Sequence, residues 1–518
     1  MSLRSLSLLT LLGLAGLSSL ASAQQPRQPS AAAARRAAER LTPADMRARI
    51  ALLSDDSLRG RNTPSPELDQ TATYIAAEFR RLGLQPAGDS GGYIQRYPIR
   101  CTRPDTSSFV ELSLGNTSAR WQVGRDVAAF AGQVKDGDAT GPTVLFAGMP
   151  TDTADLFGGV ELRNATLLAV IPAQDLQKGN QIMPHVTRAL RRGASTWLIV
   201  TNLPAQVFAG MAGGGAQPSC NAGAPSDLAA LTILGVRDSS TMGVLRAAGE
   251  DVAALLTTTT TVVRALPGLT THLHGSSQVT SEASAPNVVG ILPGSDPALR
   301  AEHIVVTAHM DHLGVGRPVN GDSIFNGADD NASGTAAVLE IAQAFTRLDT
   351  RPRRSIIFLA VSGEEEGLWG SGWYVSHPAA PLAQTVADFD LDMISRGWRD
   401  SVSVIGLDFS TLGETIRRVG REHAALVAQP VIDHWPEQNF LYRSDHINFA
   451  QRGVPILYFL DGTPSDYHRV TDTVDRIDAE AAARIARLAF LTALDVANAA
   501  ARPEWDAASR QRIVTRGP

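Results

Sequence analysis

The C-terminal half of the chain alternates short apolar runs with helical segments, and this alternation constrains the fold more than any other feature. Five apolar, β-branched runs predict strands, at 287–292, 304–308, 356–361, 386–393 and 456–459. Helical periodicity lies between and after them, at 332–348, 412–423 and 479–500. Such alternation is typical of a sheet covered by helices on both faces. We therefore predict an α/β fold, a three-layer sandwich with a mostly parallel central sheet.

The 518 residues are enough for two to four domains. From about 121 to 275, short β-branched runs are separated by Gly, Asp and Pro, which predicts a small β-rich domain inserted into a larger one. The larger domain then consists of 42–120 and 276–501. Residues 24–41 are predicted to be a flexible leader and 502–518 a polar tail that frays.

The first residues resemble a secretory signal. Arg4 precedes an apolar run at 8–20 and the small residues Ala21-Ser22-Ala23, which predicts a signal peptide over 1–23 and export to the periplasm or the medium. The apolar run is shorter than the ~20 residues that span a bilayer, and no later segment comes close, so no membrane span is expected. An oxidising compartment would allow Cys101 and Cys220 to form a disulfide, but the sequence leaves their pairing open.

Composition narrows the class of protein. Hydrophobic residues make up 44% and charged residues 19%, as in ordinary folded proteins. The net charge is -6 and no basic stripe is present, so nucleic acid is not an expected partner.

Acidic residues and histidines follow the predicted strands, where α/β sheets gather their functional groups. These residues are His309, Asp311, Asp330, Glu364, Glu365, Asp392 and His468. Taken singly, each has an ordinary explanation as a helix cap, a solvated loop residue or a surface histidine. Taken together, carboxylates and imidazoles without thiolates predict a site for a borderline cation such as zinc.

Five segments in this order closely resemble the co-catalytic di-zinc aminopeptidases, which are relatives of glutamate carboxypeptidase and glutaminyl cyclase. The segments are His309-x-Asp311, Asp329-Asp330 with Ser333-Gly334, Glu364-Glu365, Leu391-Asp392-Met393, and Ser444-Asp445-His446 followed by Tyr467-His468. The resemblance implies a phosphorylase/hydrolase-like sandwich. A looser similarity, of pattern and position, implies that 121–275 is a protease-associated domain.

The resemblance also implies a ligand set for two zinc ions per chain. One zinc would take His309 and Asp392, the other Glu365 and His468, and Asp330 would bridge them. Glu364 would be the general base that takes a proton from a metal-bridged water.

Other residues near the motifs receive supporting roles. Asp311 and Asp472 are expected to orient metal-bound imidazoles, although a turn or cap explains Asp472 equally well. Tyr467 and Tyr442 are the candidates for stabilising the transition state, with core packing as the alternative. His312 is expected not to be a ligand. Asp445 and His446 are expected to hold a loop beside the site.

The predicted function is that of an exported zinc aminopeptidase that removes N-terminal residues from peptides. A carboxypeptidase or dipeptidase is the alternative, in which Arg396, Arg399 or Arg443 grips a C-terminal carboxylate instead of forming structural ion pairs. A glutaminyl cyclase is less favoured, and a non-catalytic binding protein would show decayed ligands. No His-Glu-x-x-His motif occurs. Side-chain preference, peptide length and oligomeric state stay open.

Overall fold

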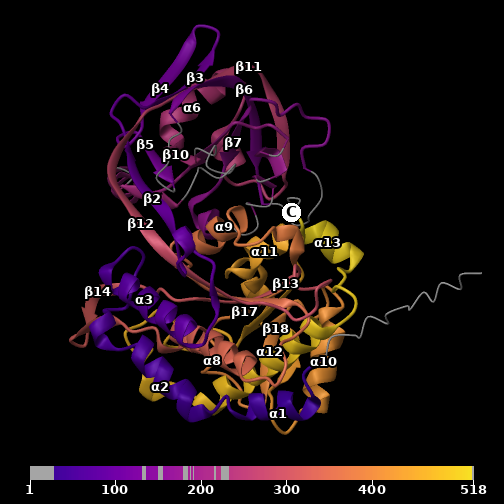
Figure 1. Cartoon of the computed structure of the whole chain (residues 1–518). Helices are drawn as coiled ribbons and strands as arrows, with labels where there is room; N and C mark the ends of the chain where they lie inside the picture. Colours follow the sequence, from indigo (N-terminus) through magenta and orange to yellow (C-terminus); the bar gives the residue numbers. More distant parts are fainter. Residues whose placement is uncertain are drawn as a thin grey trace, which may run out of the picture.

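The described part of the computed structural model contains two large β-sheets, each with hydrophobic clusters on both faces, and a two-stranded ribbon (Figure 1). It describes residues 28–130, 136–149, 156–178, 182, 185, 186, 188–190, 192–214, 218–222 and 233–515. The predicted signal peptide, 1–23, lies outside these residues. The two sheets occupy opposite ends of the molecule, and the long strands β2 and β12 run from one end towards the other (Figure 1).

The first sheet has ten strands. Nine of them form one continuous path, in the order β19 (Gln429–Val431), β18 (Ser401–Ile405), β20 (Ile456–Leu460), β17 (Thr385–Leu391), β13 (His303–His309), β16 (Ser355–Val361), β12 (Ser277–Leu292), β2 (Ile94–Pro104) and β9 (Ser219–Ala222). The short β1 (Gln85–Pro86) pairs with β12. A separate two-stranded ribbon is made of β14 (Gly314–Val319) and β15 (Asp322–Phe325).

The centre of the first sheet is parallel and its flanks are mixed. Strands β20, β17, β13 and β16 are consecutive neighbours and all run parallel. The pairings of β12 with β16 and β2, of β2 with β9, and of β18 with β20 are antiparallel. The predicted mixed α/β fold is confirmed, but "mostly parallel" holds only for the central strands. The additional antiparallel strands were not recognisable because β2 and the first half of β12 are largely polar.

Helices pack on both faces of the first sheet, because its central strands are apolar on both sides. In β16, Ile356, Phe358 and Ala360 face one core, whereas Ile357, Leu359 and Val361 face the other. The first core is covered by α1 (Ala31–Glu39), α2 (Pro43–Leu53), α3 (Pro66–Arg81), α8 (Gly334–Thr346), α10 (Leu412–Glu422) and α12 (Ala479–Asn498). The second is covered by α9 (Trp369–Ser376), α11 (His446–Gln451) and α13 (Ala507–Ile513).

The second sheet has eight strands and lies within residues 109–275. Their order is β4 (Thr117–Gln122), β3 (Phe109–Leu114), β11 (Val262–Gly275), β6 (Gly137–Ala147), β7 (Thr166–Val170), β8 (Thr196–Thr201), β10 (Ile233–Arg237) and β5 (Val127–Phe130). The described helices of this part include α5 (Ala205–Gly214), α6 (Asp238–Ala247) and α7 (Val252–Leu255). Hydrophobic cores lie on both faces of this sheet. Adjacent residues of a strand point to opposite faces, and the neighbours Leu145 and Phe146 of β6 belong to different clusters.

The predicted boundaries of the inserted unit need correction. Strands β3 and β4 were assigned to the larger domain because the unit was expected to begin at 121, but they belong to the second sheet. Conversely, β9 lies inside the predicted insertion and pairs with β2 of the first sheet. A disulfide between Cys101 and Cys220 joins these two strands across 119 residues of sequence. The pairing that the sequence left open is therefore present.

Both ends of the described chain are also more ordered than predicted. The leader expected over 24–41 includes α1, where Ser30 caps the helix and Ala33, Ala37 and Ala38 are buried. The polar tail expected over 502–518 includes α13, whose Ile513 is buried in the second core. Both helices carry few large apolar residues, so their sequences show little periodicity, and packing against the domain stabilises them instead.

Among the described residues, no helix is both long and apolar enough to cross a membrane.

Candidate metal centre

The residues predicted to carry chemistry meet at one edge of the first sheet. His309 ends β13, Glu364 and Glu365 follow β16, Asp392 follows β17, and His468 lies in the loop after β20. These four strands are parallel neighbours, so their carboxyl ends lie at the same edge. Asp330 reaches this edge from the irregular helical turn Ala328–Ser333, which leads into α8.

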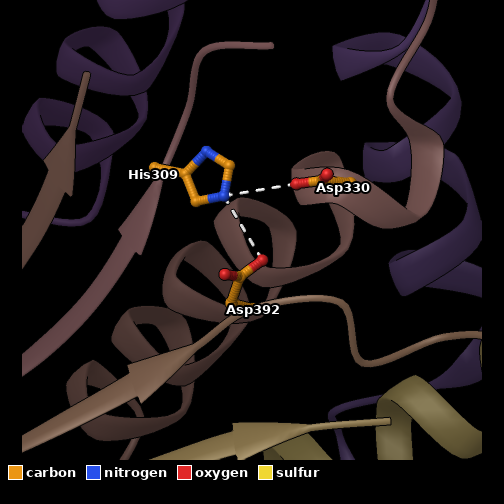
Figure 2. A group of neighbouring side chains, drawn as sticks. All are labelled: His309, Asp330 and Asp392. Carbon is orange, nitrogen blue, oxygen red and sulfur yellow. Dashed lines mark hydrogen bonds and ion pairs between the residues drawn. The ribbon is translucent and has the colours of Figure 1, made fainter. Parts of the chain in front are cut away.

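The first cluster at this edge consists of His309, Asp330 and Asp392, which come from three different segments and point toward one another (Figure 2). Nε2 of His309 lies 3.3 Å from Oδ1 of Asp330 and 3.3 Å from Oδ1 of Asp392. All three side chains are buried. Ser444 donates a hydrogen bond of 2.9 Å to Oδ2 of Asp392, which holds that carboxylate with Oδ1 facing the cluster.

The second cluster uses the other oxygen of Asp330. Nε2 of His468 lies 3.2 Å from Oδ2 of Asp330 and 3.1 Å from Oε2 of Glu365. Asp330 therefore contributes one carboxylate oxygen to each cluster. A carboxylate placed in this way can bridge two metal ions. The two histidines that the oxygens of Asp330 face are far apart in sequence, so tertiary contacts bring them to the same residue.

The donor atoms of the two clusters fit a divalent metal ion. They are imidazole nitrogens and carboxylate oxygens, the ligands that zinc takes when thiolates are absent. Burial would lower the pKa of His309, but Asp392 and Glu364 outweigh it and raise that pKa well above its ordinary value. Burial would also lower the pKa of His468. Hydrogen bonds to Asp330 and Glu365 outweigh this effect and raise that pKa to about 10. A metal ion at either cluster would compete with protons for these imidazoles.

Asp330, rather than Asp329, faces the clusters, in agreement with the prediction. Oδ1 of Asp329 instead accepts hydrogen bonds from the backbone N–H and the hydroxyl of Ser395, at 2.8 and 2.7 Å. The turn that carries these two acids begins after Gly327, which has φ +57°. A Cβ there would lie 2.1 Å from the carbonyl oxygen of Asp330 and 2.5 Å from the ring of His312.

Asp472 has a different function from the predicted one. It was expected to orient an imidazole, but its carboxylate accepts hydrogen bonds from the backbone N–H groups of Asp329 and Asp330, at 2.9 and 3.1 Å. It therefore holds the turn that presents Asp330. The turn role, which the sequence left as an equal alternative, is the observed one.

Asp311 lies behind His309 and also holds the neighbouring loop. Its carboxylate is 3.6 Å from Nδ1 of His309, while its backbone carbonyl is nearer, at 3.2 Å. Oδ2 of the same carboxylate accepts hydrogen bonds from the hydroxyl of Thr63 and the backbone N–H of Gly363, both at 2.8 Å. The carboxylate of Asp311 thus positions the segment that carries Glu364, and its orienting effect on His309 stays a prediction.

Glu364 lines a small cavity together with Asp330 and Asp392. Burial raises the pKa of Glu364 well above its ordinary value. His309 opposes this rise, and the negative charges of Asp392 and Glu365 add to it. A carboxyl group with a raised pKa beside a cavity is suited to accept a proton and release it again.

Three tyrosines near the site differ in their positions. Tyr467 lines the cavity, and its ring stacks on His468 with 3.8 Å between centroids. Tyr442 is 47% exposed and does not line the cavity, so the structure gives no support to it as the alternative. Tyr458 was not foreseen, because its place in the apolar run of β20 indicates only core packing. Its hydroxyl lies at the cavity and donates to Oδ2 of Asp392 at 3.4 Å.

His312, expected not to be a ligand, lies against the second cluster. Its Nδ1 is 2.7 Å from Oε1 of Glu365 and 3.8 Å from Oδ2 of Asp330. Its ring meets that of His468 edge to face, at 5.8 Å. His468 approaches both carboxylates within 3.2 Å. His312, Asp330 and Glu365 also form a group that could hold a metal ion, which was not expected of His312.

Asp445 and His446 hold a loop beside the site, as expected. Asp445 accepts a hydrogen bond from Ser371. His446 lies 3.3 Å from Asp390 through Nδ1 and 3.0 Å from the backbone carbonyl of Leu441 through Nε2.

Arg61 is a supporting residue that the sequence did not reveal. Its guanidinium is buried beneath the site and donates to the backbone carbonyls of Met310, Asn326 and Gly327. These carbonyls belong to the segments that carry His309 and Asp330. Burial lowers the pKa of Arg61 to about 10, and nearby Asp311 counteracts part of that effect, so the group keeps its charge at neutral pH. Arg61 lies far in sequence from every motif, so no pattern indicated its role.

Replacing Arg61 by Met should destabilise the domain and loosen the site. A hydrogen bond to a charged group contributes about 1.5–3 kcal/mol, and three are lost, so the free energy of unfolding should fall by about 3 kcal/mol or more. Metal affinity should fall about 10–100-fold. Urea unfolding and metal titration measure both effects. The matched control is Arg59→Met, since Arg59 is exposed and lies 3.6 Å from Glu67. Equal effects of the two substitutions would contradict the role of Arg61.

Comparison with known proteins agrees with this geometry. Residues 287–493, which include all five proposed ligands, match Peptidase family M28. This part of the chain is similar to the peptidases of that family. In sequence, it is similar to the aminopeptidase YwaD of Bacillus subtilis, with 25% identity over 201 residues, 38% of this chain and 41% of that protein. It is also similar to a probable zinc metalloprotease of Pyrenophora tritici-repentis, with 24% identity over 44% of this chain and 55% of that protein.

The chain spans about half the length of these curated relatives. Among solved structures, an aminopeptidase from Aneurinibacillus sp. strain AM-1 aligns over 91% of this chain and 97% of its own, with 20% identity and a TM-score of 0.48.

Proposed function

We propose that the protein is an exported, zinc-dependent aminopeptidase that removes N-terminal residues from peptides. The observation that carries this proposal is the position of Asp330, which gives one carboxylate oxygen to each of two histidine-containing clusters. The M28 family match supports peptidase activity. The name of the Bacillus subtilis relative favours the amino end of the peptide as the site of cleavage.

Two zinc ions per chain suit the two clusters. His309 and Asp392 would hold one ion, Glu365 and His468 the other, and Asp330 would contact both. When bound, the pair would supply Lewis-acid activation of water and of the scissile carbonyl. The similarity to a probable zinc metalloprotease supports the choice of metal.

Glu364 acts as the general base. It lines the cavity beside Asp330 and Asp392, and its pKa is raised, so it accepts a proton from the attacking water and passes it to the leaving amine. Its position next to Glu365 in the sequence brings the base to the site without using it as a ligand. Tyr467, which also lines the cavity, is placed to donate a hydrogen bond to the oxygen that becomes negatively charged.

The proposal also covers export of the protein and the role of the unit that carries the second sheet. The signal-like sequence over 1–23 and the Cys101–Cys220 disulfide support export to an oxidising compartment. The unit that carries the second sheet would be a protease-associated domain that shields the site or selects peptides by size.

The experiment that tests the proposed function uses the purified chain from Gln24 onward, supplied with zinc. Free aminoacyl anilides are compared with their N-acetylated counterparts, with and without a chelator. Release from the free-amine set alone, abolished by the chelator and restored by zinc, is expected. Equal release from both sets would exclude an aminopeptidase. No release from either set, together with cleavage of peptides that have a free C-terminus, would establish the carboxypeptidase alternative.

A further inference from the structure

Three arginines could in principle bind a carboxylate of the substrate, and their surroundings differ. Arg396 forms an ion pair with Asp466, and Arg399 forms one with Asp478 at 2.6 Å. Both are therefore structural. Within the described part of the chain, no carboxylate forms an ion pair with Arg443, whose side chain is exposed. Arg443 lines the same cavity as Asp330, Glu364 and Asp392.

Neutral groups hold Arg443 in place. Its Nη2 donates to the hydroxyl of Tyr467 and its Nη1 to Oε1 of Gln438, both at 3.3 Å. Gln438 accepts a second hydrogen bond from Thr463, which also lines the cavity. The guanidinium lies 5.0 Å from the centre of the Phe440 ring. The side chain is thus oriented by contacts that leave its positive charge uncompensated.

The negative charges of the site determine the net charge of the cavity that Arg443 lines. Asp330, Glu364, Glu365 and Asp392 carry four negative charges when ionised, and two divalent ions would balance them. Arg443 would then leave the loaded cavity with a net positive charge. A peptide substrate matches such a cavity when it brings a negative group to it.

We propose that Arg443 is a substrate-recognition residue that binds a carboxylate within one or two residues of the scissile bond. The limit follows from the chain's reach of about 3.3–3.6 Å per residue and from the cavity that Arg443 shares with Glu364. The carboxylate is either the C-terminal α-carboxylate of a short peptide or the side chain of Asp or Glu. The planar guanidinium suits a carboxylate of either origin, because it can donate two parallel hydrogen bonds. This inference rests on the proposed peptidase function.

Matched substrates separate the two sources of the carboxylate. Leu-Gly is compared with Leu-Gly-amide for the α-carboxylate, and Leu-Glu-amide with Leu-Gln-amide for the side chain. Each pair is assayed as kcat/KM with the zinc-loaded wild type, Arg443→Gln and Arg443→Lys. The wild type should prefer the charged member of at least one pair by about 10–100-fold. Arg443→Gln should abolish that preference, and Arg443→Lys should retain part of it.

The matched control is Arg421→Gln, since Arg421 is exposed at the end of α10 and does not line the cavity. This variant should keep the preference of the wild type. A wild type without preference in either pair, or a preference that survives in Arg443→Gln, would overturn the proposal.

A binding measurement keeps this test independent of the reaction. Calorimetry compares N-acetyl-Gly-Gly with its amide on the zinc-loaded wild type and on Arg443→Gln. If the acid binds the wild type more tightly than the amide does, and Arg443→Gln loses this difference, the subsite is supported. This conclusion holds even if no peptide is hydrolysed. Lack of hydrolysis would reject only the proposed peptidase function. An acid-over-amide ratio that is the same in both proteins rejects the subsite.

Discussion

The Glu364→Gln variant should retain its metal ions and lose most of its turnover. The amide has nearly the same shape as the carboxylate but cannot accept the proton of the attacking water. General acid–base catalysis contributes about 10²–10⁴-fold, so kcat should fall by at least that range, with further loss if the water is misplaced. The measurement combines steady-state kinetics on an aminoacyl anilide with metal analysis of the same sample.

A neighbouring residue provides the control for this prediction. Glu366 follows two residues later in the same loop and is exposed, so Glu366→Gln should leave kcat nearly unchanged. Near-normal activity of Glu364→Gln would reject its role as the base. Loss of metal together with activity would show that Glu364 is a ligand instead.

The Asp330→Asn variant should weaken both metal sites at once. Each oxygen of Asp330 faces a different histidine, 3.3 Å from His309 and 3.2 Å from His468. The substitution removes the negative charge and replaces one of the two oxygens by a donor. Loss of an outer-shell partner costs about 10–100-fold in metal affinity, so loss of a shared ligand should exceed about 100-fold for both ions. Titration with zinc, followed by metal analysis after dialysis, measures the affinity and the number of ions.

Asp329→Asn is the matched control. Oδ1 of Asp329 accepts hydrogen bonds from Ser395, and the amide oxygen of asparagine can accept the same bonds. This variant should bind two ions with nearly normal affinity. Two tightly held ions in Asp330→Asn would contradict the bridging position, and loss of only one ion would assign Asp330 to a single site.

Much of the site could be predicted from the sequence because the pattern at strand ends is local. His309, Glu364 and Asp392 directly follow or end apolar runs that are buried on both faces, and such runs form the centre of a parallel sheet. Their meeting at one edge follows from that topology. The choice of Asp330 over Asp329, and its bridging role, came from the family resemblance and not from the local pattern.

Other features could not be predicted because their sequences lack a distinctive period or composition. The polar parts of β2 and β12 read as surface loops, yet they pair along their length and extend the sheet. Arg61 lies far in sequence from every motif, and Tyr458 lies inside an apolar run. Only their contacts with the site reveal their roles. Asp472 follows His468 closely in sequence, yet its carboxylate is used by the backbone of a turn that lies elsewhere in the chain.

By itself, the sequence determined the α/β class, the central strands and the residue types of a metal centre, because hydrophobic periodicity and strand-end chemistry are encoded over short windows. The tertiary structure alone decided which atoms face one another. It divided the oxygens of Asp330 between two histidines and paired Cys101 with Cys220. It also gave Arg396 and Arg399 acidic partners and, among the residues that the structure describes, none to Arg443. The physical reason is that contacts over long sequence separations depend on how the loops pack at the edge of the sheet, and no local pattern specifies that packing.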